Sequence, residues 1–166
     1  MTDAERSSAD RNLSHHNAFE QADTGYRLST VVFDVTVTTT EQPDGFQYTV
    51  DIVAPSLSAA TADDVGQTVQ TDWFETLERR LADAPNATRT SVELDEIQVT
   101  DQGETVSIQY RFTRPDPTVG PDICKTFAEY VEGTYVEGIV PGYEYVSPVS
   151  NLLSNASQGE NSGTPL

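Results

Sequence analysis

The chain has 166 residues, with 27 acidic and nine basic side chains, and its formal net charge is −18. This length suits one domain, and an apolar share of 36% still allows a sizeable core. We expect no membrane span, because the longest apolar runs are three residues against the about 20 that a span needs, and no export signal. A single cysteine excludes an intrachain disulfide framework.

The basic side chains are eight scattered arginines and one lysine, Lys125. A compact body of this charge repels itself, and molar salt relieves the repulsion by shortening the screening length to about 3 Å. The near-absence of lysine beside abundant Asp, Glu and Thr therefore predicts a halophilic, cytoplasmic protein. Phosphate-rich partners require a basic patch, so we expect neither nucleic acid nor a membrane surface as a partner.

The first half of the chain predicts a β-hairpin after a polar start. Residues 1–24 are polar, with a weak amphipathic helix around Leu13 to Ala22. Apolar and polar residues then alternate over 31–37 and again over 46–54, which is the period of half-buried strands. Pro43-Asp44-Gly45 between them favours a turn, because proline presets φ and glycine tolerates positive φ.

A helix follows over about 72–83 and ends before Pro85. Asp72 and Glu75 resemble a capping box at its start. The residues at helical spacing that form its apolar stripe are Trp73, Phe74, Leu77 and Leu81.

The next segment predicts a second hairpin, turning at Asp101-Gln102-Gly103. In a regular strand the even-numbered Val92 and Leu94 would face one side of the sheet, and the odd-numbered Ile97 and Val99 would face the other. A β-bulge near Asp95-Glu96 would keep all four facing inward.

Pro121-Asp122 opens the last predicted helix, and Gly138 ends it. Gly133 lies inside this helix at a cost of about 1 kcal/mol relative to alanine, which the close approach of another backbone would explain. Residues 139–166 then predict an irregular arm, mobile over its last eleven residues.

This order of elements predicts an α+β fold: a two-layer sandwich in which an antiparallel sheet of two β-hairpins carries helices on one face. We divide the chain into a polar N-terminal segment (1–24), a single α+β domain (25–146) and a C-terminal arm (147–166). The element order is similar to that of small secretion chaperones and their cytosolic relatives.

Five segments of the chain carry a family resemblance: Asp72–Thr76, Ala84–Thr88, Val92–Asp95, Glu129–Tyr143 and Asn155–Gly159. Through them the chain resembles an uncharacterised family of small acidic haloarchaeal proteins, a family of unknown function. The resemblance runs from about residue 17 onward and is most specific in 129–143. It implies a haloarchaeal, cytosolic, single-domain protein and supplies no activity, cofactor or catalytic residue.

Two sets of residues are candidates for binding. One is an interaction surface on the last helix and the arm, where tyrosine is typical of protein interfaces: Tyr130, Gly133, Tyr135, Tyr143 and Tyr145. The other is a pocket between sheet and helices: Trp73, Phe74, Tyr110 and Phe127.

Other reactive residues offer little chemistry. His15-His16 lacks the further ligands that zinc requires, so we expect no metal and no cofactor. Cys124 lies in the first turn of the last helix without a base nearby, which favours a buried, inert thiol. Asp95-Glu96 at the predicted bulge is the best carboxylate pair for acid–base catalysis, although solvated surface carboxylates fit the same pattern.

We therefore expect a non-catalytic protein-interaction or chaperone-like adaptor module that binds a protein partner or a second copy of itself as a homodimer. A small-molecule binding domain is the alternative, and a carboxylate-based enzyme is a third possibility.

The charge yields a prediction that is independent of function. Lowering the salt from molar to about 0.1 M should lower the melting temperature, because screening of the −18 charge weakens. Thermal unfolding followed by circular dichroism over a salt series measures this. A melting temperature that stays constant across the series would contradict halophilic adaptation.

Overall fold

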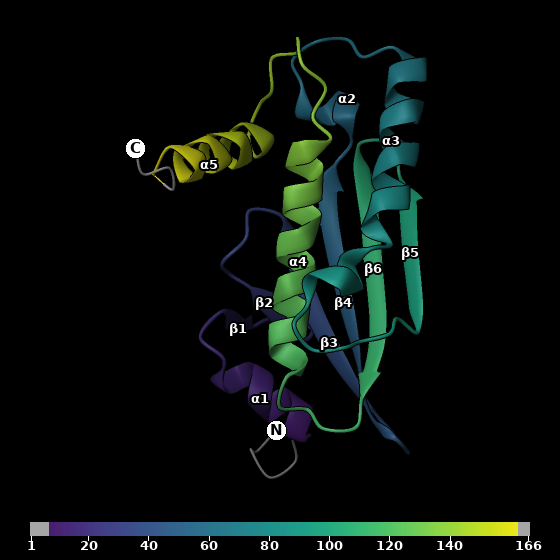
Figure 1. The fold of residues 1–166 in the computed structure, drawn as a ribbon, viewed down its shortest axis with the longest axis vertical. Coiled ribbons are helices and arrows are strands. Elements are labelled where there is room, and N and C mark those ends of the chain that lie inside the picture. Colours follow the sequence, from purple (N-terminus) through teal and green to yellow (C-terminus); the bar gives the residue numbers. More distant parts are fainter. Residues whose placement is uncertain (1–6, 163–166) are drawn as a thin grey trace.

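A computed structural model describes the backbone of residues 7–162 and the side chains of residues 7–156 (Figure 1). Over that range the chain forms a six-stranded, wholly antiparallel sheet of order β1-β2-β3-β4-β6-β5. The strands are β1 (Phe19–Gln21), β2 (Tyr26–Leu28), β3 (Asp34–Gln42), β4 (Gly45–Pro55), β5 (Glu96–Asp101) and β6 (Thr105–Arg114). The helices are α1 (Ser8–His15), α2 (Leu57–Ala60), α3 (Gln67–Leu81), the 3-10 turn η2 (Ala84–Ala87), α4 (Gly120–Glu137) and α5 (Val149–Ser162). The fold is α+β, as predicted.

The pair β3–β4 follows the alternation in the sequence. Gln42 pairs with Gly45 at the tip, and Asp34 pairs with Val53 at the far end. Only glycine fits at position 45, because its φ is +144° and an added Cβ would lie 2.2 Å from the Arg114 carbonyl oxygen. The strand begins at Asp34 rather than near Val31, since the amides of the two preceding residues are bonded to a helix side chain instead of the ladder.

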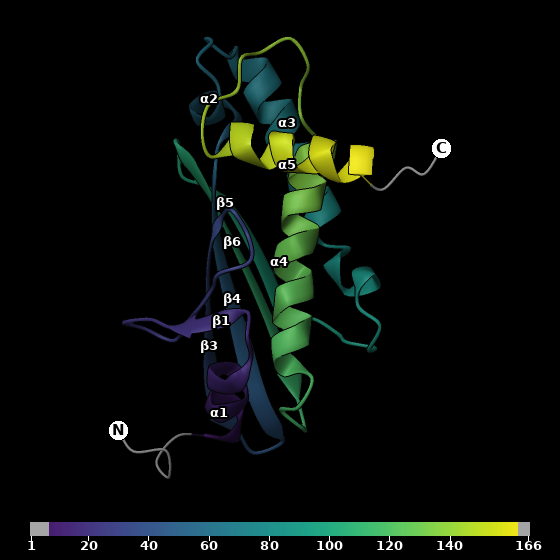
Figure 2. The same cartoon turned by 90° about the vertical axis from the view of Figure 1, so that its left-hand side faces the viewer.

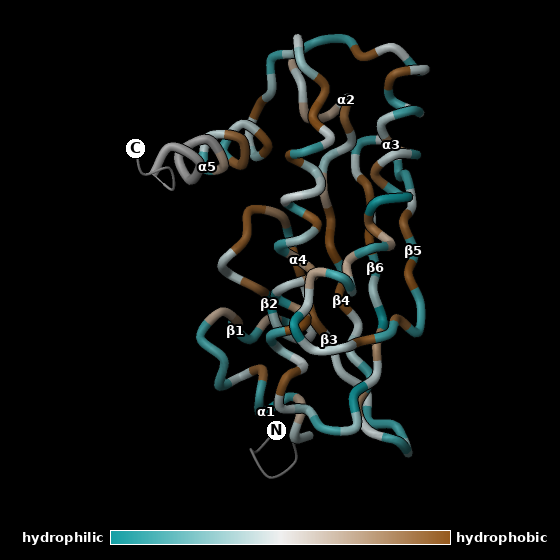
Figure 3. The backbone as a smooth tube through the Cα atoms, viewed as in Figure 1, coloured by the Kyte–Doolittle hydropathy of each residue, from teal (hydrophilic) through white to brown (hydrophobic). Residues whose placement is uncertain are grey.

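The pair β4–β6 forms the centre of the sheet and of the core. Tyr48 lies opposite Phe112, Val50 opposite Tyr110, and Ile52 opposite Ile108. All of these side chains are fully or almost fully buried. Figure 3 shows the resulting alternation of hydrophobic and hydrophilic residues along both strands.

Both long helices lie on one side of the sheet (Figure 2). Most residues that face the other side are polar and half-buried, among them Thr49, Asp51, Gln109 and Arg111, and Val53 is exposed there. One face of each central strand is therefore covered by helices, and the other presents mainly hydroxyl, amide and charged groups.

The strand β5 begins at Glu96, and residues 91–94 before it are not in a strand. The Asp95 amide donates to the Arg111 carbonyl at 2.7 Å, at the point where pairing starts. The inward-facing positions switch from even to odd numbers between Leu94 and Ile97, and this switch falls where β5 begins. It therefore marks the start of a strand and not a bulge between two strand segments.

Helix α3 begins five residues before the predicted start. Gly66 is its N-cap and makes no side-chain capping bond, so the capping box expected at Asp72 and Glu75 is wrong. The Gln70 side chain accepts hydrogen bonds from the amide and hydroxyl of Ser58, which fastens the added first turn to α2. Trp73, Leu77 and Leu81 are buried as the stripe predicted, and the helix ends before Pro85.

Helix α4 has the predicted extent, but Gly133 has a different environment from the one expected. Its position is exposed, and an added Cβ would meet nothing within 4 Å. The expected close approach of another backbone at Gly133 is therefore absent among the described residues. A side chain approaches closely at Gly120 instead, where an added Cβ would lie 2.1 Å from the Tyr48 ring.

The two ends of the chain are more regular than predicted. The N-terminal stripe is split: Leu13 is buried on α1, whereas Phe19 belongs to β1 at the sheet edge. The irregular arm contains α5, which packs through Val149 and Leu152 and crosses α4 near its C-terminal end (Figure 2). The predicted mobility of the last eleven residues falls largely outside the described side chains. Among the described helices, none has the length and apolar content of a membrane span.

The two helix glycines should respond oppositely to substitution by alanine. Gly120→Ala should lower the free energy of unfolding by about 1–3 kcal/mol, because the new methyl group overlaps the buried Tyr48 ring. Gly133→Ala should raise it by about 0.5–1 kcal/mol, because alanine is the better helix former in open space. Urea unfolding at constant molar salt measures both, and equal effects of the two substitutions would contradict the packing described.

Candidate binding groove between helices α3 and α4

Helix α4 is positioned by an aromatic cluster that fills the space under it. Phe127 lies with its ring centroid 5.0 Å from Tyr110 and 5.5 Å from Phe112, and Tyr48 stacks on Phe112 at 5.0 Å. The Tyr110 hydroxyl donates to the Leu81 carbonyl at 2.7 Å, so the same cluster also holds the end of α3. The interior between the sheet and these two helices is packed with rings.

The predicted pocket residues consequently do not surround a cavity between sheet and helices. Tyr110 and Phe127 are fully buried and in contact with each other. Phe74 is half-buried beside the core. Trp73 is 5% exposed and packs edge-on against Tyr135 with centroids 5.5 Å apart. Trp73 also lines an open groove.

That groove lies on the molecular surface between α3 and the end of α4, with a volume of about 290 Å³. Helix α3 supplies two adjacent stripes at spacing i, i+4, i+8, one apolar and one polar. The apolar stripe is Val69, Trp73 and Leu77, and the polar stripe is Asp72, Thr76 and Arg80. Thr134, Gly138 and Val140 form the opposite wall.

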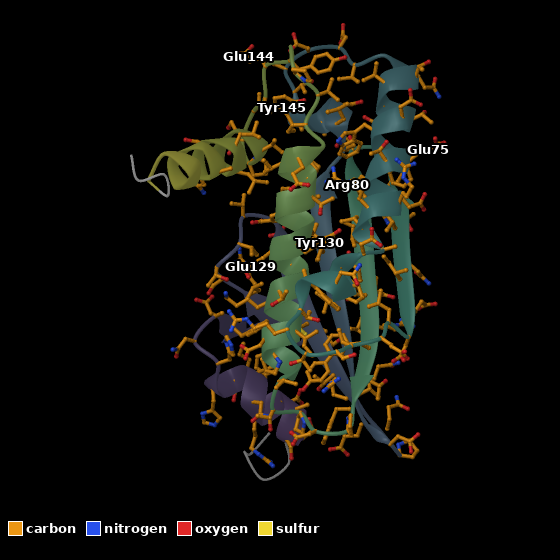
Figure 4. The ribbon with its side chains drawn as sticks, in the orientation of Figure 1. Glu75, Arg80, Glu129, Tyr130, Glu144 and Tyr145 are labelled. Atoms are coloured by element: carbon orange, nitrogen blue, oxygen red, sulfur yellow. The ribbon has the colours of Figure 1, made fainter. Side chains whose placement is uncertain are left out.

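Polar contacts fix the shape of this groove. Arg80 forms an ion pair with Glu137 across the two helices, and the Tyr130 hydroxyl donates to the Arg80 carbonyl at 2.8 Å. Figure 4 shows Arg80 and Tyr130 where α3 and α4 face each other. The two helices are therefore joined at one end of the groove by an ion pair between side chains and by a hydrogen bond from a side chain to a main-chain carbonyl.

The wall that contains Val140 is held by a loop anchored to α2. The Tyr145 hydroxyl donates to the Val140 carbonyl at 2.6 Å and accepts from the Val140 amide at 3.2 Å. Tyr145 in turn pairs with Thr61 in an isolated β-bridge, and the Asp63 carboxylate accepts from the Glu144 amide at 2.6 Å. Figure 4 places Glu144 and Tyr145 in this loop beyond the end of α4.

Trp73 carries an unusual polar atom. Its Nε1 is buried, and within the described part of the chain it has no hydrogen-bond partner. A buried donor without a partner costs about 1–3 kcal/mol. The unpaired Nε1 at the floor of the groove therefore lowers the free energy of unfolding.

The predicted tyrosine surface is wrong at Tyr135, and its other residues lie in different parts of α4 and the loop after it. Tyr135 is fully buried between Phe33 and Trp73, and its hydroxyl donates to the Pro55 carbonyl at 2.8 Å, so it belongs to the core. Tyr130 is half-buried against α3. Gly133 is exposed, and Tyr143 and Tyr145 lie half-buried in the loop after α4. Substituting Tyr135 would test core packing and not an interface.

The carboxylates considered for catalysis serve the outer face of the sheet. Asp95 accepts from the Thr113 hydroxyl at 2.6 Å and from the Gln47 side chain at 3.3 Å. Glu96 instead accepts from Arg111 at 2.9 Å. The two neighbours therefore engage different cross-strand partners.

The remaining reactive residues have structural contacts. His16 Nδ1 accepts from the Ala18 amide at 3.1 Å, which leaves Nε2 to donate to Asp122 at 2.8 Å and so to tie α1 to α4. Cys124 is fully buried, as expected, and burial raises the pKa of its thiol. Among the described residues no cluster of His, Cys, Asp or Glu could hold a metal ion.

Glu132 is a residue that sequence reasoning missed. One carboxylate oxygen accepts from the amides of Val32 and Phe33, at 2.6 and 2.7 Å. Burial raises the pKa of this carboxyl despite the two donors, which lower it. No pattern distinguishes Glu132 from the other acidic residues on α4, because its partners are backbone groups about 100 residues away.

The family model of a family of unknown function, DUF5813, matches residues 14–155. The chain belongs to this family. The DUF5813 match covers every element from β1 to β6, both long helices and the groove between them. No curated protein and no solved structure matches the chain significantly.

The buried carboxyl of Glu132 yields a pH prediction. Its folded-state pKa lies above the unfolded value, so its contribution favours the fold in acid and is lost as the pH rises through the folded-state pKa. The free energy of unfolding of the Glu132→Gln variant, which is neutral at every pH, should therefore rise relative to the natural protein from about pH 4 to pH 7.

Urea unfolding at constant molar salt measures this difference, since both proteins then experience nearly the same general repulsion. A difference that is constant over the range, or that changes in the opposite direction, would contradict the environment assigned to Glu132.

Proposed function

We propose that this DUF5813 protein is a non-catalytic interaction module of adaptor or chaperone-like type, and that its partner protein docks in the groove between α3 and α4. The observation that carries the proposal is the groove itself. It combines an apolar floor (Val69, Trp73 and Leu77) with a polar rim (Asp72, Thr76 and Arg80) on one helix. Protein interfaces have this anatomy of an apolar centre and a polar border.

The open shape of the groove favours a protein segment over a small molecule that needs to be enclosed. Pockets for drug-sized ligands span about 300–1,000 Å³ and enclose most of the ligand. This groove has about 290 Å³ and is open along the surface. It suits an apolar side chain projecting from a docked segment, whose main chain would lie along the rim.

We place this activity in a salt-rich cytoplasm. The support is the charge of −18 and the presence of a single lysine among nine basic residues. In molar salt, long-range attraction between charged surfaces is screened, and apolar burial strengthens relative to it. A groove with an apolar floor can therefore bind a partner at high salt, because its attraction comes from apolar burial.

A pair of matched variants tests the proposal. Thr76 lies in the groove wall, and Thr71 is exposed on α3 outside the groove. Thr76→Arg should fill the groove and abolish partner binding, whereas Thr71→Arg makes the same chemical change and should leave binding intact. Proteins captured at molar salt by the natural chain and by Thr71→Arg, but lost with Thr76→Arg, define the partner.

The chain's single tryptophan then reports binding directly. Addition of the purified partner should change the Trp73 fluorescence saturably in the natural chain and in Thr71→Arg, but not in Thr76→Arg. If the partner is a second copy, sedimentation should show a dimer that Thr76→Arg converts to a monomer. A partner that binds Thr76→Arg and the natural chain equally would overturn the assignment of the groove.

A further inference from the structure

A second groove, of about 360 Å³, lies at the opposite end of α4. The loop that follows η2 forms one side, through Thr88, Arg89 and Thr90. The first two turns of α4 form the other side, through Lys125 and Thr126 among others. It is separate from the α3–α4 groove and shares no lining residue with it.

Two positive side chains converge on this groove in a chain that has few. Lys125 is the only lysine of the sequence. Arg89 is exposed and, within the described part of the chain, makes no ion pair or hydrogen bond. A chain that otherwise avoids lysine has placed its single one beside an unpaired arginine.

Hydroxyl groups complete a set of donors. The Thr88 hydroxyl is engaged with the main chain, at 2.9 Å from the Pro85 carbonyl and 2.7 Å from that of Thr90, and so holds the loop in shape. Thr90 and Thr126 line the groove beside the two cations. The positive end of the 18-residue α4 dipole lies at the same place, and no side chain caps that end.

Two carboxylates lie at or beside the groove, and each has a partner. Asp122 lines the groove with most of its side chain exposed, and one of its oxygens accepts from His16 at 2.8 Å. Glu129 pairs with Lys125 at 3.0 Å, with half of its side chain exposed. An anion in the groove would compete with this exposed carboxylate for Lys125. It would meet no competing carboxylate at Arg89 among the described residues.

We propose that this groove binds the phosphate group of a small phosphorylated ligand. A phosphate accepts several charge-assisted hydrogen bonds at once, and an arginine, a lysine and threonine hydroxyls are the donors that proteins commonly present to it. Val119 and Ile123 provide an apolar wall beside the donors, against which the organic part of a phosphate ester would pack. The inference does not depend on the function proposed for the other groove.

Titrations of the full chain with inorganic phosphate and with phenyl phosphate test the proposal, at constant molar ionic strength. We expect saturable amide shifts in nuclear magnetic resonance spectra over residues 88–90 and 119–126. Arg89→Gln and Lys125→Gln should each weaken binding by about tenfold, the loss typical of one charge-assisted hydrogen bond. Arg79→Gln removes the same charge from an exposed position on α3 and should leave the affinity unchanged.

Tighter binding of phenyl phosphate would support an ester as the ligand, and equal binding would support free phosphate; both outcomes support the phosphate site. Shifts that fail to saturate, or a loss in Arg79→Gln equal to that in Arg89→Gln, would overturn it. The spectra of the variants also show that they remain folded.

Discussion

The docking of α4 on the central strand pair β4–β6 is the constraint on which the rest of the structure depends. Phe127 on α4 packs against Tyr110 and Phe112 of β6, and Gly120 leaves just enough room for the Tyr48 ring of β4. Burial of such rings gives most of the attraction, since each removes a large apolar area from water. Polar contacts then fasten neighbouring elements to α4: His16 at the end of α1 to Asp122, Glu132 to the loop before β3, and Tyr130 and Glu137 to Arg80 of α3.

Both candidate sites follow from this arrangement, because they lie at opposite ends of α4. Where α4 faces α3, tight packing of Trp73 against Tyr135 leaves an apolar groove at the surface. Where α4 begins, the loop after η2 leaves a groove lined by Arg89 and Lys125. The two grooves differ in chemistry, since one has an apolar floor and the other brings Arg89 and Lys125 together beside Asp122. In molar salt the field of more distant carboxylates in this chain, whose charge is −18, is screened within a few ångströms.

Local patterns predicted the central elements well and the tertiary ties poorly. Alternation over 46–54 and the stripe Trp73–Leu81 were sufficient because burial of one face decides both strands and helices. The early start of α3 was missed because Gln70 gains its partner, Ser58, only in the folded chain. Spacing predicts a surface position for Tyr135 because it shows which helix face the residue occupies but not that Phe33 and Trp73 enclose it.

Hydrogen exchange of the natural chain, followed residue by residue at molar salt, tests the central role of α4 most directly. If α4 is the element on which the others depend, its amides from about 124 to 135 should exchange as slowly as those of β4 and β6, and only through global unfolding. Amides of β1, β2 and α5, which lie at the periphery, should exchange faster through local opening. Exchange of α4 well before the central strands would contradict the account, because it would show that the sheet persists without the helix.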